Sequence, residues 1–157
     1  MLINIHRPDV VCVAETWFKY DSDVQVDGYN INRKDRTYHG GGVCIYVKKD
    51  IISVESDVEE LNNTEIEQIW TCLRFRKQNL LGCVYRPPCS TPVVNNLIIE
   101  SIKSAKRAVN KKKYSDIVIT GDFNYNTIDW SDPEIPFHQV TVNHKQIHLL
   151  NVSMNAF

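Results

Sequence analysis

The chain has 157 residues, and its 18 Lys and Arg against 19 Asp and Glu give a formal charge of −1, while 43% of its residues are hydrophobic. This composition is typical of one ordinary core. It disfavours a protein that coats nucleic acid by bulk electrostatics, but not an enzyme that contacts DNA at one site. No stretch approaches the roughly 20 apolar residues of a membrane span, and the N-terminus has no secretory signal pattern. We therefore expect a single intracellular domain over residues 1–157, without a membrane segment.

The hydrophobic pattern predicts short strands with few helices between them. Two runs, VVCVA at 10–14 and IVIT at 117–120, are wholly apolar and rich in β-branched residues, so both are expected to be buried central strands. The glycines at 40–42 separate two strand patterns and predict a hairpin. In chain order the predicted strands cover residues 10–14, 29–33, 43–48, 68–75, 80–85 and 117–120.

Helical spacing of apolar residues is limited to a few segments. One helix is predicted over 95–111, and its basic residues lie toward the C-terminal end, where they are either a solvated face or a phosphate contact. With a helix before the first strand, this order predicts an α/β sandwich in which helices cover mixed sheets. A last helical face, near the chain end, contains Ile147, Leu150, Met154 and Phe157.

The cysteines and the acidic residues carry less information about function. The five cysteines form an odd set without a C-x-x-C spacing, and four of them lie in apolar strand patterns. Buried free thiols are therefore expected, in preference to a metal or disulfide role. The acidic run between residues 50 and 67 matches no calcium loop, so it is predicted to be a surface loop and strand edge.

Three polar clusters follow predicted strands, where the active groups of α/β proteins collect. Glu15 comes directly after an apolar strand, and such a carboxylate must be solvated, paired or bound to a metal. Asp122 and Asn124 suit either a water beside a phosphate oxygen or an ordinary Asx turn. Tyr85 and Arg86 suit either phosphate recognition or a packed ring beside a surface charge.

Four motifs, in this order and spacing, resemble one known family. They are PDVVCVAETWF, RKDRTYHGGGVCIYVKK, GCVYRPP and IVITGDFNYNTIDW. From residue 7 to 130, and on toward residue 157, the chain resembles the endonuclease/exonuclease/phosphatase superfamily, specifically the apurinic-type endonuclease domain of non-LTR (LINE-type) retrotransposons. The resemblance implies a four-layered α/β sandwich, two mixed β-sheets covered by helices, and a divalent cation, Mg²⁺ or Mn²⁺.

The resemblance also implies roles for individual residues. Glu15 is the implied metal ligand, and Tyr85 is a phenol that contacts phosphate. Asp122 and Asn124 are the implied pair that positions the attacking water and the phosphate oxygens. The implied substrate-binding residues are Arg36 and Arg86, which match the family's pattern as well.

Two features of the family have no counterpart in the sequence. Family members carry an Asn on a strand upstream of Met1 and a Ser-Asp-His near the end of the domain, and the chain contains no Asp-His pair. The resemblance therefore predicts a partial domain that is truncated at both ends, is unstable and is impaired in turnover.

The function that the resemblance implies is that of a metal-dependent DNA endonuclease. It would nick target DNA in the nucleus for reverse transcription, with a reverse transcriptase domain as its partner in the intact polyprotein. Two alternatives stay open: a non-catalytic remnant that binds nucleic acid or protein, and a phosphatase of the same superfamily. The YRPP and GDFN contexts favour the retrotransposon branch over the phosphatases.

Overall fold

The structure is a computed structural model, and it describes residues 2–36, 40–124 and 150–151. The short helix α1 (Leu2–His6) precedes the first strand, and the long helix α2 (Pro92–Asn110) lies between the last two long strands. A single 3₁₀ turn, η1, covers Glu59–Leu61. The strands are β1 (Val10–Ala14), β2 (Tyr29–Lys34), β3 (Val43–Lys48), β4 (Ile52–Glu55), β5 (Glu67–Arg74), β6 (Gln78–Tyr85), β7 (Asp116–Asp122) and β8 (Leu150–Asn151).

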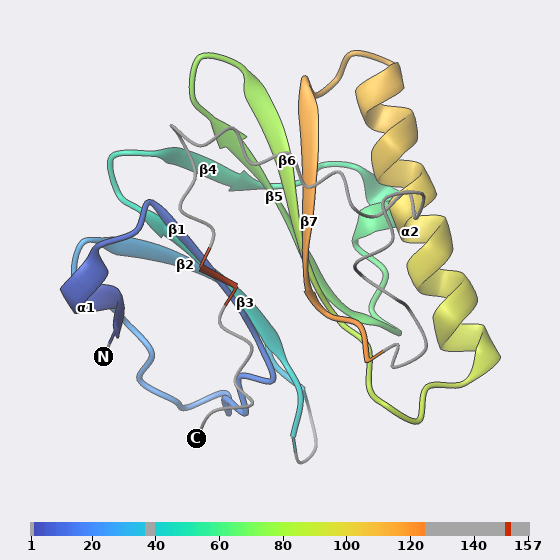
Figure 1. Cartoon of the computed structure of the whole chain (residues 1–157), viewed down its shortest axis with the longest axis horizontal. Helices are drawn as coiled ribbons and strands as arrows, with labels where there is room; N and C mark the ends of the chain where they lie inside the picture. The colour runs from blue at the N-terminus through green and yellow to red at the C-terminus, as the bar shows by residue number, and fades with distance from the viewer. Residues whose placement is uncertain (1, 37–39, 125–149, 152–157) are drawn as a thin grey trace.

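The strands form two mixed sheets that face each other. The first sheet has the order β2-β3-β1-β8 and the second has the order β4-β5-β6-β7. In each sheet one edge pair is parallel, β1 with β8 and β6 with β7, and the other pairs are antiparallel. Helix α2 covers the outer face of the second sheet, as Figure 1 shows. The predicted α/β sandwich of two mixed sheets with helices is therefore confirmed.

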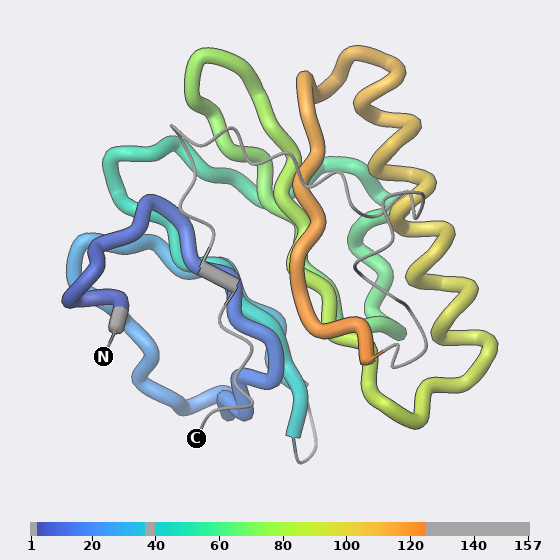
Figure 2. Tube along the Cα trace, viewed as in Figure 1, coloured from blue at the N-terminus to red at the C-terminus, as the bar shows by residue number. Residues whose placement is uncertain are grey.

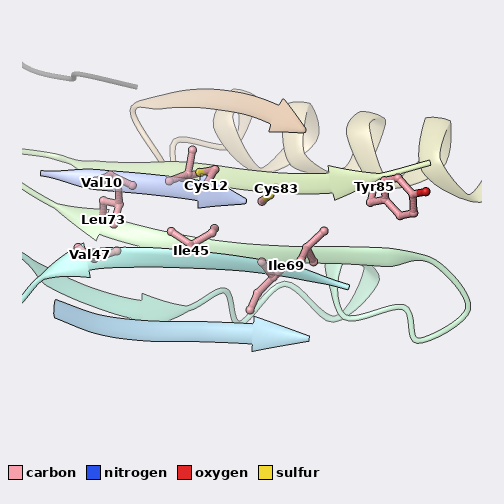
Figure 3. Close-up of a cluster of buried hydrophobic side chains, with 10 residues drawn as sticks. Val10, Cys12, Ile45, Val47, Ile69, Leu73, Cys83 and Tyr85 are labelled. Carbon is pink, nitrogen blue, oxygen red and sulfur yellow. The ribbon is translucent and has the colours of Figure 1, made fainter. Parts of the chain in front are cut away.

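The main core fills the space between the two sheets. Strand β3 is buried on both faces, because Val43, Ile45 and Val47 point into the inter-sheet layer while Cys44 and Tyr46 pack on the other side. Figure 3 shows this layer: it begins around Val10, Val47 and Leu73 and ends at Tyr85, whose ring closes it. The apolar runs thus build a rigid layer with one polar end, which is where the candidate site lies.

The start of α2 and the presence of β4 differ from the predictions. Helix α2 begins three residues before the predicted start, because Thr91 caps it by accepting a hydrogen bond from the Val94 N–H and Pro92 occupies the first turn. Strand β4 was not predicted, since it is a short edge strand whose side chains are mostly exposed.

The prediction of a last helix is wrong at Leu150, because Leu150 and Asn151 form β8 and pair in parallel with Val11 and Cys12 of β1. That pairing joins residues far apart in the sequence, so local helical spacing does not reveal it. The other three residues of the predicted helical face, Ile147, Met154 and Phe157, lie outside the described residues.

One of the two predicted central strands takes a different place. Strand β1 lies between β3 and β8, as expected. Among the described strands β7 is at the edge of the second sheet, beside β6, and most of its residues are half-buried. Figure 2 shows how the chain reaches this edge: it returns from α2 and runs along β6.

The cysteines and the basic residues behave as the sequence indicated. Cys12, Cys44, Cys72 and Cys83 are buried free thiols, and Cys89 is exposed and free. The basic residues near the end of α2 are exposed, which matches a solvated helix face, and they are Lys103, Lys106, Arg107, Lys111, Lys112 and Lys113. Phosphate contact by these residues stays a prediction.

A lysine occupies the position at the end of α2 that usually carries glycine. The Lys113 N–H donates to the Ala108 carbonyl and the Lys112 N–H to the Val109 carbonyl, which is the Schellman pattern. Lys112 closes this pattern with φ of 60°, a left-handed conformation that costs a residue with a Cβ about 1 kcal/mol.

We expect Lys112→Gly to stabilise the protein by about 0.5–1 kcal/mol, because glycine adopts this conformation without a steric cost. Lys111 is the matched control, since its φ is −77° and glycine relieves no strain there. Urea denaturation of both variants checks the prediction, and a Lys112→Gly variant no more stable than Lys111→Gly would contradict it.

Candidate active site

The ends of β1, β6 and β7 meet at one end of the inter-sheet layer. Because β6 and β7 run in parallel, Tyr85 stands opposite Asp122 at their carboxyl ends. Glu15 follows β1 directly, and its Oε1 accepts a hydrogen bond from the Tyr85 hydroxyl. The structure therefore brings Glu15 of the first sheet to Tyr85 of the second, with Asp122 as the neighbour of Tyr85.

A backbone irregularity turns Glu15 toward the second sheet. Ala14 stands opposite Val43, but the Thr16 N–H donates to the Gly42 carbonyl and the Trp17 N–H to the Gly41 carbonyl. These bonds are displaced by one residue from the β1–β3 register, so Glu15 is the extra residue of a bulge and has a φ of 54°. Such bulges re-aim a side chain beside active sites, and this one ends the regular strand at the carboxylate.

A second irregularity shapes the segment after β7. Asn124 has a φ of 47°, its N–H donates to Asp122 Oδ1 over 3.0 Å, and its side-chain Nδ2 donates to the Arg86 carbonyl over 2.9 Å. The Asx turn, which the sequence left open as one interpretation of Asp122 and Asn124, is thus present. It also fixes Asp122 and Asn124 relative to each other, and the catalytic roles of both residues stay a prediction.

Arg86 directly follows β6 and is buried, with 7% of its surface exposed. Its Nη1 donates to the carbonyls of Phe123 and Asn124, and its Nε donates to Asn95 Oδ1 of α2 over 2.7 Å. These bonds tie the segment after β7 to the first turns of α2. Substrate binding by Arg86 stays a prediction, whereas its hydrogen bonds to the segment after β7 are visible in the structure.

Arg36 lies at the same end of the sandwich, across the layer. Its Nη2 forms an ion pair of 2.9 Å with Glu67 Oε1, and both side chains are largely buried. Glu67 stands opposite Tyr85 in the β5–β6 ladder, so it belongs to the row that also contains Asp122. Glu67 was not among the predicted site residues, because in the sequence it belongs to a run of acids that was expected at the surface. The signal available in the sequence was its place directly before the predicted strand 68–75.

The surroundings keep the Tyr85 hydroxyl protonated. Burial raises the pKa of Tyr85 above its ordinary value of 10.0, and the hydrogen bond to Glu15 and the charges of Glu15, Glu67 and Asp122 raise it further. A phenol held in this way donates a hydrogen bond throughout the neutral range. The charges of Glu15, Glu67 and Asp122 thus all act on the oxygen of this hydroxyl.

Comparison with known proteins identifies the family of the chain. The sequence profile of the Endonuclease/Exonuclease/phosphatase family matches residues 2–139. The chain belongs to this family. Membership in the endonuclease/exonuclease/phosphatase family supports a hydrolase of the nuclease or phosphatase type, a class that typically uses divalent metal ions. No curated protein sequence matches the chain. In the part of the chain that the structure describes, no helix is long and apolar enough to cross a membrane.

The side chains at the strand ends fit a magnesium-type ion. Mg²⁺ prefers oxygen ligands, keeps several waters and needs only one or two carboxylates from the protein. Glu15 and Asp122 are half-buried carboxylates, of which the first contacts the Tyr85 hydroxyl and the second stands opposite Tyr85 in the β6–β7 pair. Across the described ranges no group of three or more His, Cys, Asp or Glu residues is arranged to hold a metal, so a largely protein-ligated site of the zinc type is not formed by these residues.

Proposed function

We propose that the chain is an Mg²⁺- or Mn²⁺-dependent phosphodiester hydrolase that nicks DNA, of the kind found in non-LTR retrotransposons. The observation that carries the proposal is the contact between Glu15 and the Tyr85 hydroxyl, next to Asp122. A carboxylate, a protonated phenol and a second carboxylate are the groups that hydrolysis of a phosphate diester needs: a metal ligand, a hydrogen-bond donor and a base.

Each residue has a task in an in-line attack of water on phosphorus. Asp122 orients the water and accepts its proton as the new P–O bond forms. The P–O3′ bond breaks, and the leaving 3′-oxygen takes a proton from water to give the 3′-hydroxyl. The single O–H of Tyr85, which donates to Glu15 in this structure, turns to a phosphoryl oxygen as negative charge develops there. Asn124 uses one side-chain N–H on the Arg86 carbonyl, and the amide carries a second N–H for a phosphoryl oxygen. Glu15, with Asp122 beside it, would hold the divalent ion, which supplies Lewis-acid stabilisation of the phosphoryl charge when bound.

The proposed substrate is DNA rather than a small phosphate ester. The support is the motif context, since YRPP and GDFN are similar to the retrotransposon branch of the family. In an intact polyprotein the nick would supply a 3′-hydroxyl to a reverse transcriptase domain, and the place of action would be the nucleus. A non-catalytic remnant that binds nucleic acid or protein is the alternative, and it is motivated by the absent Asp-His pair.

A comparison of substrates tests the proposal. The purified 157-residue chain is incubated with supercoiled plasmid, with a nucleotide monophosphate and with a soluble phosphoinositide, each with Mg²⁺, with Mn²⁺ and with EDTA. We expect metal-dependent conversion of plasmid to the open circle, at a low rate because the chain contains no Asp-His pair, and no phosphate release from the monoesters. Phosphate release without nicking would replace the nuclease by a phosphatase. DNA binding without any turnover would support the remnant.

A further inference from the structure

Glu67 connects the two sheets at the end where the candidate site lies. Its side chain is 16% exposed, and its two oxygens have different partners. Oε1 pairs with Arg36 at 2.9 Å, and Oε2 accepts a hydrogen bond of 2.5 Å from the Gly42 N–H. Since Arg36 and Gly42 flank the hairpin of the first sheet and Glu67 begins β5 of the second, one carboxylate joins both layers.

The glycines beside Glu67 leave room for its carboxylate. A Cβ added at Gly41 would collide with Glu67 Oε2, and one added at Gly42 would lie 2.5 Å from Thr16 Oγ1. Both glycines have positive φ, 73° and 87°. The segment is therefore built so that the backbone approaches Glu67 on one side and the residues after β1 on the other.

A set of hydrogen bonds leads from Glu67 to the two residues that follow Glu15. The Gly42 N–H donates to Glu67, the Gly42 carbonyl accepts from the Thr16 N–H, and the Gly41 carbonyl accepts from the Trp17 N–H. Thr16 and Trp17 are the residues that close the bulge in which Glu15 stands. Glu67 itself stands opposite Tyr85, so it is the backbone neighbour of one partner of the Glu15–Tyr85 contact and holds the segment that is bonded to the residues after the other.

Lys34 holds the segment that leads into Glu67. Its half-buried Nζ donates to the carbonyls of Asn63 and Ile66 at 2.7 and 2.9 Å. Burial lowers the pKa of Lys34, and the charge of Glu67 opposes that shift. The start of β5 is thus anchored to β2 by a second bridge, which fixes the position from which Glu67 reaches Gly42.

We propose that Glu67 is a positioning residue: its carboxylate anchors the Gly41–Gly42 segment and thereby holds Glu15 against Tyr85. The effect on catalysis rests on the proposed function, whereas the effect on the backbone does not. A glutamine at this position keeps an oxygen that can accept from Gly42, an aspartate keeps the charge but loses one methylene of reach, and an alanine removes both bonds.

Amide hydrogen exchange followed by NMR tests the proposal without requiring turnover. In Glu67→Ala and Glu67→Asp we expect exchange at Gly42, Thr16 and Trp17 to accelerate about tenfold or more, the scale of losing one charge-assisted hydrogen bond. Exchange at Val11, whose N–H faces β3 in the β1–β3 register, should stay slow. If Glu67→Ala does not fold, Glu67→Asp decides, and Glu67→Gln should keep protection at Gly42.

The matched control is Asp35→Asn, which also removes one carboxylate charge from an ion pair. Asp35 pairs with Arg33 at similar exposure, 19% and 23% against 16% and 24% for Glu67 and Arg36. Exchange at Thr16 and Trp17 in the Glu67 variants no faster than in Asp35→Asn would overturn the proposal.

Nicking rates of the same variants then separate the effect of Glu67 on the backbone from its effect on catalysis. We expect kcat to fall about tenfold in Glu67→Asp, because Glu67 positions Glu15 and touches no substrate. The change in KM should be smaller, and it would come from Arg36, the ion-pair partner of Glu67 that is implied to bind substrate. If exchange accelerates in the variants but the parent chain does not nick DNA, the positioning role of Glu67 is supported and the proposed nuclease function is wrong. An unchanged kcat together with accelerated exchange would overturn the link from the segment to Glu15.

Discussion

Replacing Gly121 by alanine is expected to abolish the cooperative fold or to cost more than about 4 kcal/mol of stability. Gly121 has a φ of 138° and stands opposite Val84 in the parallel pair of β6 and β7. A Cβ at this position would collide with the Val84 carbonyl oxygen, which is backbone and cannot turn aside. The strand that carries Asp122 would therefore have to separate from β6.

Gly28 is the matched control for this substitution. It also has a positive φ, 84°, but an added Cβ would meet no atom within 4 Å. Gly28→Ala should therefore cost only the conformational penalty, about 1–2 kcal/mol. Thermal and urea denaturation of both variants separate the two effects. Equal losses of stability would show that the collision with Val84 is relieved by a small shift.

Glu15→Gln is expected to lower nicking by at least about 100-fold, the order found when one electrostatic group is removed from an active site. The substitution keeps the shape of the side chain and an oxygen that can accept from the Tyr85 hydroxyl, so stability should change little. It removes the negative charge that would hold the divalent ion. Initial rates on supercoiled plasmid, with folding checked by circular dichroism, give the result.

Glu100→Gln is the control for a general effect of lost charge. Glu100 lies on α2, is exposed and pairs with Lys103, and it makes no contact with the strand ends that carry the site. Its nicking rate should equal that of the parent chain. Equal rates for the parent and Glu15→Gln would remove Glu15 from the site and leave Asp122 as the candidate ligand.

The apolar strands were the most predictable part of the fold. The run at 10–14 became β1 with the predicted bounds, and 43–48 became β3, because a strand buried on both faces has few alternatives. Short and non-local elements were missed: β4 has exposed side chains, and β8 is two residues that pair with β1 from far along the chain. Their stability comes from the neighbouring strand and not from their own sequence.

The candidate site could be predicted where carboxylates follow apolar strands and less so elsewhere. Glu15 and Asp122 stand out in the sequence because an apolar strand that ends in a carboxylate is unusual. Their catalytic roles come from a resemblance and stay predictions. Glu67 was missed, because its partners Arg36 and Gly42 approach it only when the two sheets stack. The burial of Arg86 could not be predicted either. Its acceptors include the backbone carbonyls of Phe123 and Asn124, and the sequence does not indicate which carbonyls a side chain will contact.

The binding of Mn²⁺ by the parent chain and by Glu15→Gln tests most directly whether the strand ends form a metal-assisted site. Electron paramagnetic resonance measures the free Mn²⁺, and its difference from the total gives the bound Mn²⁺ without requiring turnover. Glu100→Gln serves as the charge control. We predict one site in the parent and in Glu100→Gln, and an affinity at least about tenfold weaker in Glu15→Gln, as expected on losing a carboxylate from a site of few protein ligands. Equal Mn²⁺ affinity in all three proteins would contradict the assignment of Glu15 as the metal ligand.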